Sequence, residues 1–370
     1  MSKHALLSAS SSHRWINCPP SARLCAEYED KIGSFAIEGT EAHRLCEYKL
    51  KTSLGMDCKD PIEKLHSDEM EECVDGYVAY ILELIEIAKQ TCPDPQILIE
   101  QRLDFTRYVE DGYGTGDCVI IADGTLYIID YKHGQGVLVE AEDNSQLKLY
   151  ALGALEIFDG IYDISDVSMT IYQPRKNNIS VQTISKESLY EWAEQILKPT
   201  AQLAFSGNGK YKCGEWCRFC RAKYECRERA SQSIELARYD FRLPPLLDDS
   251  EIQEILEKVD DLISWVLDIK NYALKQAING KQWDNWKLVE GRSNRKYRDE
   301  KLVVETAKSA GYDDIYEIKL ISVSAMEKLL GKEQFNQILG SLIEKPKGKL
   351  TLVPMTDKRP SINDFMEEKQ

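Results

Sequence analysis

Residues 114–132, GTGDCVIIADGTLYIIDYK, contain two apolar runs on either side of the pair Asp123-Gly124. An Asp-Gly pair in this position is the strongest short-range signal of a β-hairpin, and its two-residue loop favours a positive φ at both positions. The predicted strands are apolar on both faces, which is typical of strands buried in an α/β sheet. The residues of one face are Val119, Ile121, Leu126 and Ile128, and those of the other are Ile120, Tyr127 and Ile129.

Charged residues stand at the open end of this hairpin. If Ala122 pairs with Thr125, the register places Asp117 opposite Asp130, where like charges destabilise the sheet. Two carboxylates at the end of buried strands need a cation, a shared proton or an opening to solvent. Lys132 follows Asp130 by two residues and therefore projects from the same face. The two carboxylates and the lysine together predict a site for Mg²⁺ or Mn²⁺ in which the lysine assists a water or a phosphate. The alternative is an ordinary hairpin end whose charged residues are solvated.

Outside the hairpin, helical and strand patterns alternate along the chain. Apolar residues recur at helical spacing through much of the segment 18–90, and short apolar runs bounded by turn residues follow it. This order predicts a mixed α/β sheet with helices on both faces. The predicted strands are 96–105, 116–122, 125–132, 166–174 and 178–185, and the predicted later helices are 144–158, 186–205 and 250–279.

A chain of 370 residues is long enough for one large domain and a smaller one. We expect a first domain over residues 1–240, with a helical insertion at about 37–92, and a small α+β region over 241–370. The stretch RLPPLLDD, residues 242–249, indicates a linker between them. The sequence has no recognisable signal peptide and no apolar run long enough to span a membrane, so we expect a soluble intracellular protein.

The chain is acidic overall, but its charge is uneven. The formal net charge of −15 argues against a nucleic-acid partner, because phosphate binding needs a basic surface. Residues 281–360, however, contain 16 Lys and Arg against 12 Asp and Glu. Basic segments with Trp286 and Tyr297 in this region suit either DNA contact, through phosphates and base stacking, or solvated loops on a small helical subdomain. The long helix predicted at 250–279 could instead serve self-association.

Eleven cysteines without a secretory signal indicate thiols and metal ligands rather than disulfides. Cys46, Cys73 and Cys118 lie in apolar-periodic segments and are interpreted as small buried hydrophobic residues. The segment CGEWCRFCRAKYEC, residues 213–226, holds four further cysteines. These four thiols could bind zinc locally, although zinc knuckles more usually present two close cysteine pairs, and five residues separate the last two thiols here.

The hairpin residues resemble the signature of the PD-(D/E)XK nuclease superfamily, an acid followed by acid-x-lysine on the next strand. Asp117 and Asp130-Tyr131-Lys132 meet this pattern. Further motifs resemble the RecB-like branch, which includes nuclease domains of bacterial recombination helicases and the iron-sulfur nucleases of CRISPR adaptation. The resemblance covers residues 5–235 and implies a restriction-endonuclease-like sheet flanked by helices. The whole chain also resembles a phage and prophage family of this branch with a basic C-terminal region.

Three more motifs of the branch match this sequence. The segment GTEAH ends at His43 and resembles the Gly-x-x-x-His motif, and Glu100 resembles the acid that precedes the hairpin and supports the metal or its water. Gln146 and Tyr150 resemble the Gln-x-x-x-Tyr motif, which implies that they hold the DNA backbone beside the metal. The implied metal ligands are His43, Asp117, Asp130 and the carbonyl of Tyr131, and the implied catalytic residues are Lys132, Asp117, Asp130 and Glu100.

The iron-sulfur members of the branch take one cysteine from near the N-terminus and three from a late cluster. The segment SASSSHRWINCPPSARL, residues 8–24, resembles their N-terminal pattern of serines, an aromatic residue and Cys-Pro. The resemblance implies a four-iron four-sulfur cluster, makes zinc the less favoured occupant and leaves Cys213 without a role. The implied ligands are Cys18, Cys217, Cys220 and Cys226.

The resemblance implies a metal-dependent deoxyribonuclease that hydrolyses phosphodiester bonds, as an exonuclease or end-processing enzyme of phage DNA replication or recombination. We expect DNA and phage replication or recombination proteins as partners, and the cytoplasm of a bacterial host cell as the location. One alternative is a non-catalytic DNA-binding or assembly protein that retains the fold and the cluster, against which the intact acid, acid and lysine argue. Another is a zinc-stabilised interaction module unrelated to nucleases.

Overall fold

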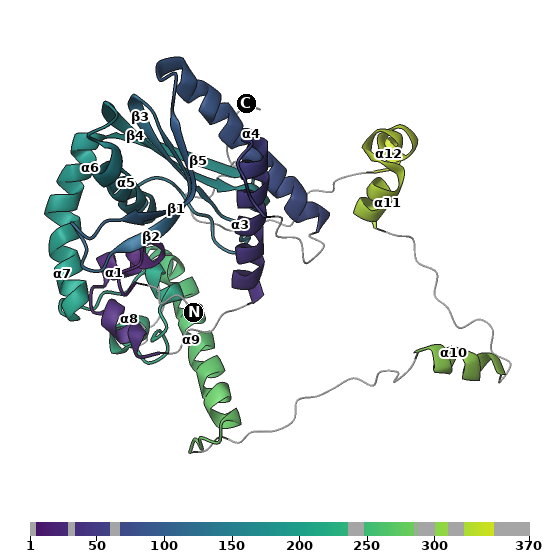
Figure 1. The fold of residues 1–370 in the computed structure, drawn as a ribbon. Helices are drawn as coiled ribbons and strands as arrows, with labels where there is room; N and C mark the ends of the chain where they lie inside the picture. The colour runs from purple at the N-terminus through teal and green to yellow at the C-terminus, as the bar shows by residue number, and fades with distance from the viewer. Residues whose placement is uncertain are drawn as a thin grey trace, which may run out of the picture. The chain divides into compact units, whose positions relative to one another are not determined.

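The structure is a computed structural model. It describes residues 5–28, 34–59, 67–235, 248–284, 286, 300–309 and 322–343. The chain divides into two units, Met1–Ala273 and Leu274–Gln370. The first unit contains the sheet and all the site residues named above, and Figure 1 labels its helices and strands.

A five-stranded mixed sheet lies at the centre of the first unit. Its strands are β1 Gln96–Asp104, β2 Tyr113–Ile121, β3 Gly124–Tyr131, β4 Ile164–Gln173 and β5 Asn178–Ser185. They are ordered β1-β2-β3-β4-β5, and only the β3–β4 pair is parallel. Parallel neighbours need a crossover connection, which helix α5 (Ser145–Phe158) supplies. The predicted mixed sheet is therefore confirmed.

The predicted hairpin of β2 and β3 forms, and its register is the predicted one. The N–H of Ala122 donates to the carbonyl of Thr125 at 3.3 Å. Successive pairs then run along the two strands as far as Cys118 opposite Ile129. The Asp-Gly signal and the apolar alternation were therefore sufficient to fix which residues face one another.

The turn itself differs from the prediction. Gly124 has a positive φ of 87°, but Asp123 has none, so positive φ at both positions is wrong. The start of β4 explains the difference, because Asp163 donates its N–H to Oδ1 of Asp123 at 3.0 Å. The carbonyl of Asp163 accepts the N–H of Gly124 at 2.7 Å. Contacts from outside the hairpin thus hold the loop in its conformation.

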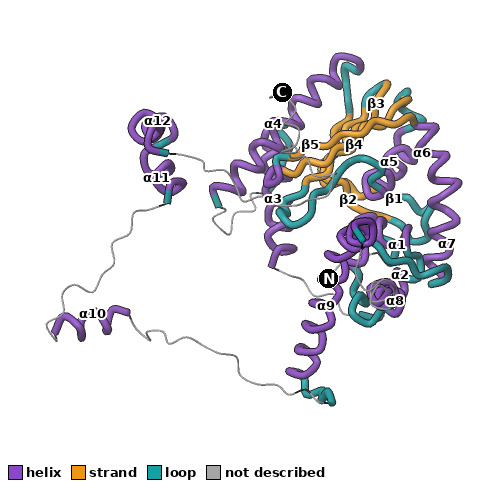
Figure 2. Tube along the Cα trace, turned by 180° about the vertical axis from the view of Figure 1, so that it is seen from behind, coloured by secondary structure: helices purple, strands orange, loops and turns teal. Residues whose placement is uncertain are grey.

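Helices cover both faces of the sheet (Figures 1 and 2). On one face, Val119 and Leu126 belong to an apolar core that also contains residues of α5, α6 and α7. On the other face, Ile120 and Ile129 pack in a second core with α3 and α4. This alternation is the one that the sequence predicts. The helices are α3 Ser34–Ser53, α4 Asp68–Thr91, α6 Lys186–Trp192 and α7 Lys198–Ser206.

Helix α5 packs closely on β1 at Gly153. A Cβ atom at this position would lie 2.9 Å from Cβ of Leu103 and 3.1 Å from the carbonyl oxygen of Asp104. We expect Gly153→Ala to lower the free energy of unfolding by about 1–3 kcal/mol, because the helix must move away from the strand. Urea denaturation measures the change. Gly160→Ala is the control, since no atom lies within 4 Å of its Cβ position, and equal losses in the two variants would contradict the close contact.

The helix predicted over 186–205 forms with one irregularity. Between α6 and α7 the backbone makes a π-helical turn, Ala193–Leu197. Pro199 stands at the start of α7 and lacks the N–H that would bond to the preceding turn, so regular helical hydrogen bonding is interrupted there.

Short helices flank this core on either side in sequence. Helices α1 (Ser12–Asn17) and α2 (Ser21–Ala26) precede it, and α8 (Arg227–Glu235) follows the cysteine-rich segment. Helix α9 (Asp249–Ile278) belongs to the first unit up to Ala273, although the sequence assigned it to the C-terminal region. Its Tyr272 stacks on Tyr224 with ring centroids 4.4 Å apart.

The second unit is helical where the structure describes it. Its helices are α10 Glu300–Ser309, α11 Val323–Leu330 and α12 Lys332–Leu339. No strand occurs among the described residues after Ala273, so the strand component of the predicted α+β region is not found there. The basic segments 291–298 and 345–349, together with Tyr297, lie outside the described residues.

Candidate functional site

Three carboxylates stand side by side across β1, β2 and β3. The paired residues on both sides of Glu100 and Asp117 share one register, so these two acids are neighbours across β1 and β2. Asp130 follows the last residue of β3 that pairs with β2 and is the neighbour of Asp117 on the other side. Glu100 has a φ of 52°, a left-handed conformation that is rare for glutamate. Backbone strain of this kind clusters at functional sites.

His43, Glu100 and Asp117 form a compact group of ligand atoms. One such atom from each residue lies within 4.8 Å of the other two. Nδ1 of His43 is 3.2 Å from Oδ1 of Asp117 and 4.0 Å from Oε1 of Glu100. The other oxygen of Asp117 accepts the N–H of Tyr131 at 2.7 Å, which fixes the orientation of the carboxylate. Helix α3 thus brings a histidine to acids that come from two strands.

Asp130, which is buried, forms an ion pair with Lys132, which is 28% exposed, beside this group. Oδ2 of Asp130 lies 2.8 Å from Nζ of Lys132, but not in hydrogen-bond geometry, so this buried oxygen has no hydrogen-bond partner. Gln146 donates to Oδ1 of Asp130 at 2.9 Å and accepts a hydrogen bond from Lys132 at 3.1 Å. Gln146 also donates to the hydroxyl of Tyr150 at 3.1 Å. Gly114 leaves room for that ring, since a Cβ there would lie 2.6 Å from Cε1 of Tyr150.

The pKa values of these groups report a concentration of negative charge. Burial lowers the pKa of His43, but the charge and hydrogen bond of Asp117 outweigh it and raise that pKa to about 9. Burial and the charge of Asp117 raise the pKa of Glu100 to about 7. Burial also raises the pKa of Asp130, although Lys132 opposes the shift. A cation placed among these carboxylates would stabilise their ionised forms.

The donor set fits a hard divalent cation, for which carboxylate oxygens are preferred ligands. The compact group differs from the predicted ligand set, because Glu100 belongs to it and Asp130 instead contacts Lys132. Tyr131 contributes its N–H to Asp117, and the role of its carbonyl as a ligand stays a prediction.

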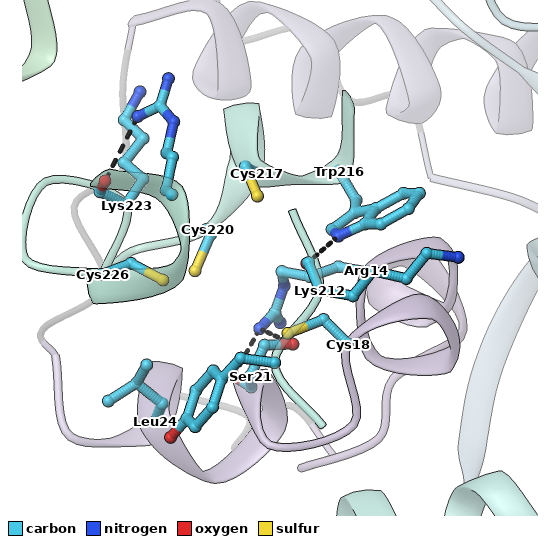
Figure 3. Close-up of a pocket in the computed structure, with 12 residues that line it drawn as sticks. Arg14, Cys18, Ser21, Leu24, Lys212, Trp216, Cys217, Cys220, Lys223 and Cys226 are labelled. Carbon is cyan, nitrogen blue, oxygen red and sulfur yellow. Dashed lines mark hydrogen bonds between the residues drawn. The ribbon is translucent and has the colours of Figure 1, made fainter. Parts of the chain in front are cut away.

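Four cysteines from two distant segments line one hollow (Figure 3). One comes from the end of α1 and three from the segment 217–226. Figure 3 shows their sulfur atoms turned into the same space. The residues that line this hollow do not include Cys213. The four cysteines are Cys18, Cys217, Cys220 and Cys226, the set that the resemblance implies.

A zinc ion and an iron-sulfur cluster require different spacings of the four sulfur atoms. In a tetrahedral zinc site with Zn–S distances of about 2.3 Å, the sulfurs stand about 3.8 Å apart. Within the described part of the chain, no three cysteine sulfurs lie within 4.8 Å of one another. A four-iron four-sulfur cluster has a larger core than a single ion and also takes four thiolates. The four cysteines of the hollow supply thiolates that either occupant could use, and the four-iron four-sulfur cluster stays a prediction.

Two further thiols contact this set from outside the hollow. Sγ of Cys25 lies 3.6 Å from Sγ of Cys220, and Sγ of Cys213 lies 3.7 Å from Sγ of Cys217. Cys25 was not identified from the sequence. Cys25 lies on α2 and Cys18 at the end of α1, and no local pattern in the sequence indicated that Cys25 would reach Cys220.

Four cationic side chains line the same hollow and are the second feature that the sequence did not reveal: Arg14, Lys212, Lys223 and Arg229. They offset the negative charge that four thiolates and a cluster would bring together. Arg229 donates to Oδ2 of Asp268 at 2.6 Å, and Nζ of Lys223 lies 2.9 Å from Oδ1 of Asp268. Asp268 belongs to α9, so this helix supports the wall of the hollow.

No helix of the described residues is long and apolar enough to cross a membrane. Of the C-terminal aromatic residues singled out in the sequence, Trp286 is described and is 80% exposed.

The solved structures to which the chain is similar include one titled "Crystal structure of SSO0001", with 12% sequence identity over 62% of this chain and 89% of that chain. The TM-score of this match is 0.29, and a similarity of that size carries no argument about fold or function. A family model with the description "Protein of unknown function (DUF2800)" matches residues 4–360. This match covers nearly the whole sequence, and the chain therefore belongs to the DUF2800 family.

Proposed function

We propose that the protein is a metal-dependent deoxyribonuclease, an exonuclease or end-processing enzyme that hydrolyses phosphodiester bonds in phage DNA replication or recombination. The observation that carries the proposal is the assembly around Asp117 of two neighbouring carboxylates, a histidine and a partly buried lysine, brought together from α3 and three adjacent strands. Buried like charges destabilise a fold unless something compensates for them. A role in binding a cation and a phosphate explains this group of charged residues better than a contribution to the stability of the fold.

The arrangement of the first unit supports its assignment to the PD-(D/E)XK fold and to the RecB-like branch. Three antiparallel strands lead into a crossover helix and a parallel fourth strand. The acid of the motif is on β2, the acid-x-lysine is on β3, and Gln146 on the crossover helix contacts both members of the acid-x-lysine. The nearness of these residues to one another supports the proposal.

A Mg²⁺ or Mn²⁺ ion would be held by His43, Glu100 and Asp117, with Asp130 beside them. When bound, such an ion polarises the phosphate and lowers the pKa of a water molecule. Asp117 keeps its orientation through the N–H of Tyr131. The left-handed backbone at Glu100 turns that carboxylate toward the histidine, 4.0 Å away.

The remaining chemistry depends on side chains of the chain itself. In hydrolysis, the water oxygen bonds to phosphorus, the bond from phosphorus to one sugar oxygen breaks, and that oxygen takes up a proton. Lys132 would orient the attacking water and stabilise the negative charge that grows on the phosphate. Gln146 restrains Lys132 through their 3.1 Å hydrogen bond. Gln146 would contact the DNA backbone. Tyr150, one helical turn further on, is 5% exposed and would position Gln146 by accepting its hydrogen bond.

The cysteine hollow would hold a four-iron four-sulfur cluster with a structural role. Its ligands come from both ends of the nuclease domain, so the cluster would join the N-terminal helices to the segment that follows α7. Binding free energy from such a link contributes to folding. This role requires no exchange of electrons with the DNA.

A digestion assay tests the proposed activity. End-labelled linear DNA, circular DNA and single-stranded DNA are incubated with the full chain and Mn²⁺. We expect cleavage of at least one substrate, loss of cleavage with EDTA, and at least a hundredfold lower rate for Asp117→Ala, because this variant loses a central ligand. Asp75→Ala is the matched control, since that aspartate is 66% exposed and lies on α4, away from the carboxylate row.

Each outcome of this assay has a clear meaning. Equal cleavage by wild type and Asp117→Ala would refute the site, because the activity would then come from elsewhere. Binding of DNA without cleavage of any substrate, with either metal, would favour the non-catalytic DNA-binding alternative.

A further inference from the structure

Helix α9 carries a line of aliphatic residues that are exposed in the described part of the chain. We call these residues the α9 stripe. Each of them is 43–65% exposed, and no residue of α9 is fully buried. Scattered exposed leucines are ordinary on a protein surface, whereas a continuous apolar line on one helix marks an interaction site. The α9 stripe consists of Ile252, Leu256, Ile263, Leu267, Leu274 and Ile278.

The spacing of the α9 stripe keeps it on one side of the helix. Its members alternate at intervals of four and seven residues, which makes an eleven-residue repeat. Eleven residues are close to three turns of α-helix, so the line hardly drifts around the helix. Asp268 and Tyr272, which contact the cysteine-rich segment, lie on roughly the opposite side. The stripe therefore faces away from the contacts that attach α9 to the first unit. Figure 1 shows α9 as one uninterrupted helix.

The α9 stripe is symmetric about its middle. Ile252 and Ile278 are equally distant in sequence from position 265, and so are the pairs Leu256 and Leu274, and Ile263 and Leu267. An identical helix that runs in the opposite direction therefore brings every aliphatic residue of the stripe opposite another one. A two-fold interface requires this self-complementarity, because the same surface serves both partners.

Two charged residues on the same side of α9 obey the same symmetry. Asp260 and Lys270 are both exposed and are equally distant from position 265. In an antiparallel pair, each Asp260 faces the Lys270 of the other copy, twice in the interface. In a parallel pair in register, aspartate would face aspartate and lysine would face lysine, which is repulsive. The charge pattern therefore favours the antiparallel direction.

We propose that the protein forms a homodimer in which α9 pairs with the α9 of a second copy of this chain, antiparallel and with its two-fold axis crossing the stripe midway between Ile263 and Leu267. The stripe spans about 39 Å of helix, at about 1.5 Å per residue, which gives a long and narrow apolar seam. This interface leaves the side of α9 that carries Asp268 in contact with the cysteine-rich segment. It places the two proposed metal sites of the dimer in a fixed symmetric relation. The dimer itself does not depend on the proposed activity.

Charge reversal tests both the contact and its direction. The mass of the full-length protein is measured over a range of concentrations by sedimentation equilibrium. We expect a dimer for the wild type, and a dissociation constant that is about tenfold or more higher for Asp260→Lys and for Lys270→Asp, because each replaces two attractions by two repulsions. The double variant, Asp260→Lys with Lys270→Asp, restores the opposed charges and is expected to return to within about threefold of the wild type.

The outcomes distinguish the antiparallel dimer from a parallel dimer, an unrelated contact and a monomer. Single reversals that leave the dimer unchanged would overturn the proposal in favour of a parallel or unrelated contact, because a parallel pair merely exchanges one like-charge pair for another. A wild type that stays monomeric at all concentrations would also overturn it. Glu257→Lys is the matched control, because this substitution reverses a negative charge at an exposed position outside the stripe. Leu256→Asp tests the apolar seam, with far-UV circular dichroism to confirm that α9 remains folded.

Discussion

Cys18→Ala is expected to lose its iron and its brown colour when purified without oxygen, whereas the wild type retains about four iron atoms per chain. The residue lies at the end of α1 and supplies one of the four thiols that are turned into the hollow. Three thiolates from one short segment cannot hold the cluster as four do, so the loss should be nearly complete. Iron and acid-labile sulfide content measure this change directly.

The same substitution is expected to destabilise the fold. The cluster would close a chain loop of about 200 residues, and by analogy with a disulfide such a link contributes on the order of 2–5 kcal/mol. For a domain of this size the melting temperature should then fall by roughly 10 °C. Thermal unfolding followed by circular dichroism, in the absence of oxygen, gives this value.

Cys213→Ala and Cys25→Ala are the matched controls for Cys18→Ala. Each of these residues contacts a thiol of the hollow, at 3.7 Å and 3.6 Å, but neither lines it. Both variants are therefore expected to keep iron and colour. Loss of iron from Cys213→Ala, with iron retained by Cys18→Ala, would show that the ligands form a local set within the segment 213–226. Zinc in place of iron in the wild type would show that the occupant is a different metal.

The hairpin of β2 and β3 shows how much a local signal can determine. Gly124, with its positive φ, allows the tight turn, and the two-residue alternation of apolar side chains decides which face each strand buries. Register and burial were therefore predictable from the sequence alone. The conformation of Asp123 was not, because its hydrogen bond to Asp163 joins segments that are forty residues apart.

The residues that form the ligand group were harder to predict from the sequence than the register of the hairpin. Glu100 could be recognised as an acid in a strand, but its left-handed backbone has no signature in the residues around it. That conformation brings its carboxylate to within 4.0 Å of His43. Asp130, in contrast, takes Lys132 as its partner because the two are neighbours on one face of β3. A pattern of spacings indicates which residues gather, but not how each side chain is directed.

The position of His43 depends on contacts far from it in sequence. Arg175, which follows β4, lies 3.0 Å from Glu38 on α3 and 3.0 Å from Glu69 on α4. This pair of contacts holds the two helices on the same end of the sheet, and α3 then presents His43, five residues after Glu38, to the carboxylates. Since no local pattern links Arg175 to these glutamates, sequence motifs could suggest His43 but could not position it.

Replacing Lys132 separates catalysis from metal binding. Lys132→Ala is expected to lower the rate of DNA hydrolysis by about 10²–10³-fold, because the charge that would stabilise the phosphate is removed. Its binding of Mn²⁺, measured by electron paramagnetic resonance, should persist, since none of the groups in the His43, Glu100 and Asp117 set is changed. Asp117→Ala, in contrast, should lose both binding and hydrolysis. Lys89→Ala, an exposed lysine on α4, is the surface control.

A second variant, Lys132→Gln, keeps the test of Lys132 valid if Lys132→Ala does not fold. Removal of the lysine leaves the buried carboxylate of Asp130 without its ion pair, a change that can destabilise a protein by about 3–5 kcal/mol. Glutamine keeps a hydrogen-bond donor near Asp130 and Gln146 but carries no charge. A folded Lys132→Gln protein that binds Mn²⁺ and hydrolyses DNA at the wild-type rate would exclude the lysine from the reaction. If instead it binds the ion and is inactive, the positive charge of Lys132, and not only its hydrogen bonds, acts in the cleavage step.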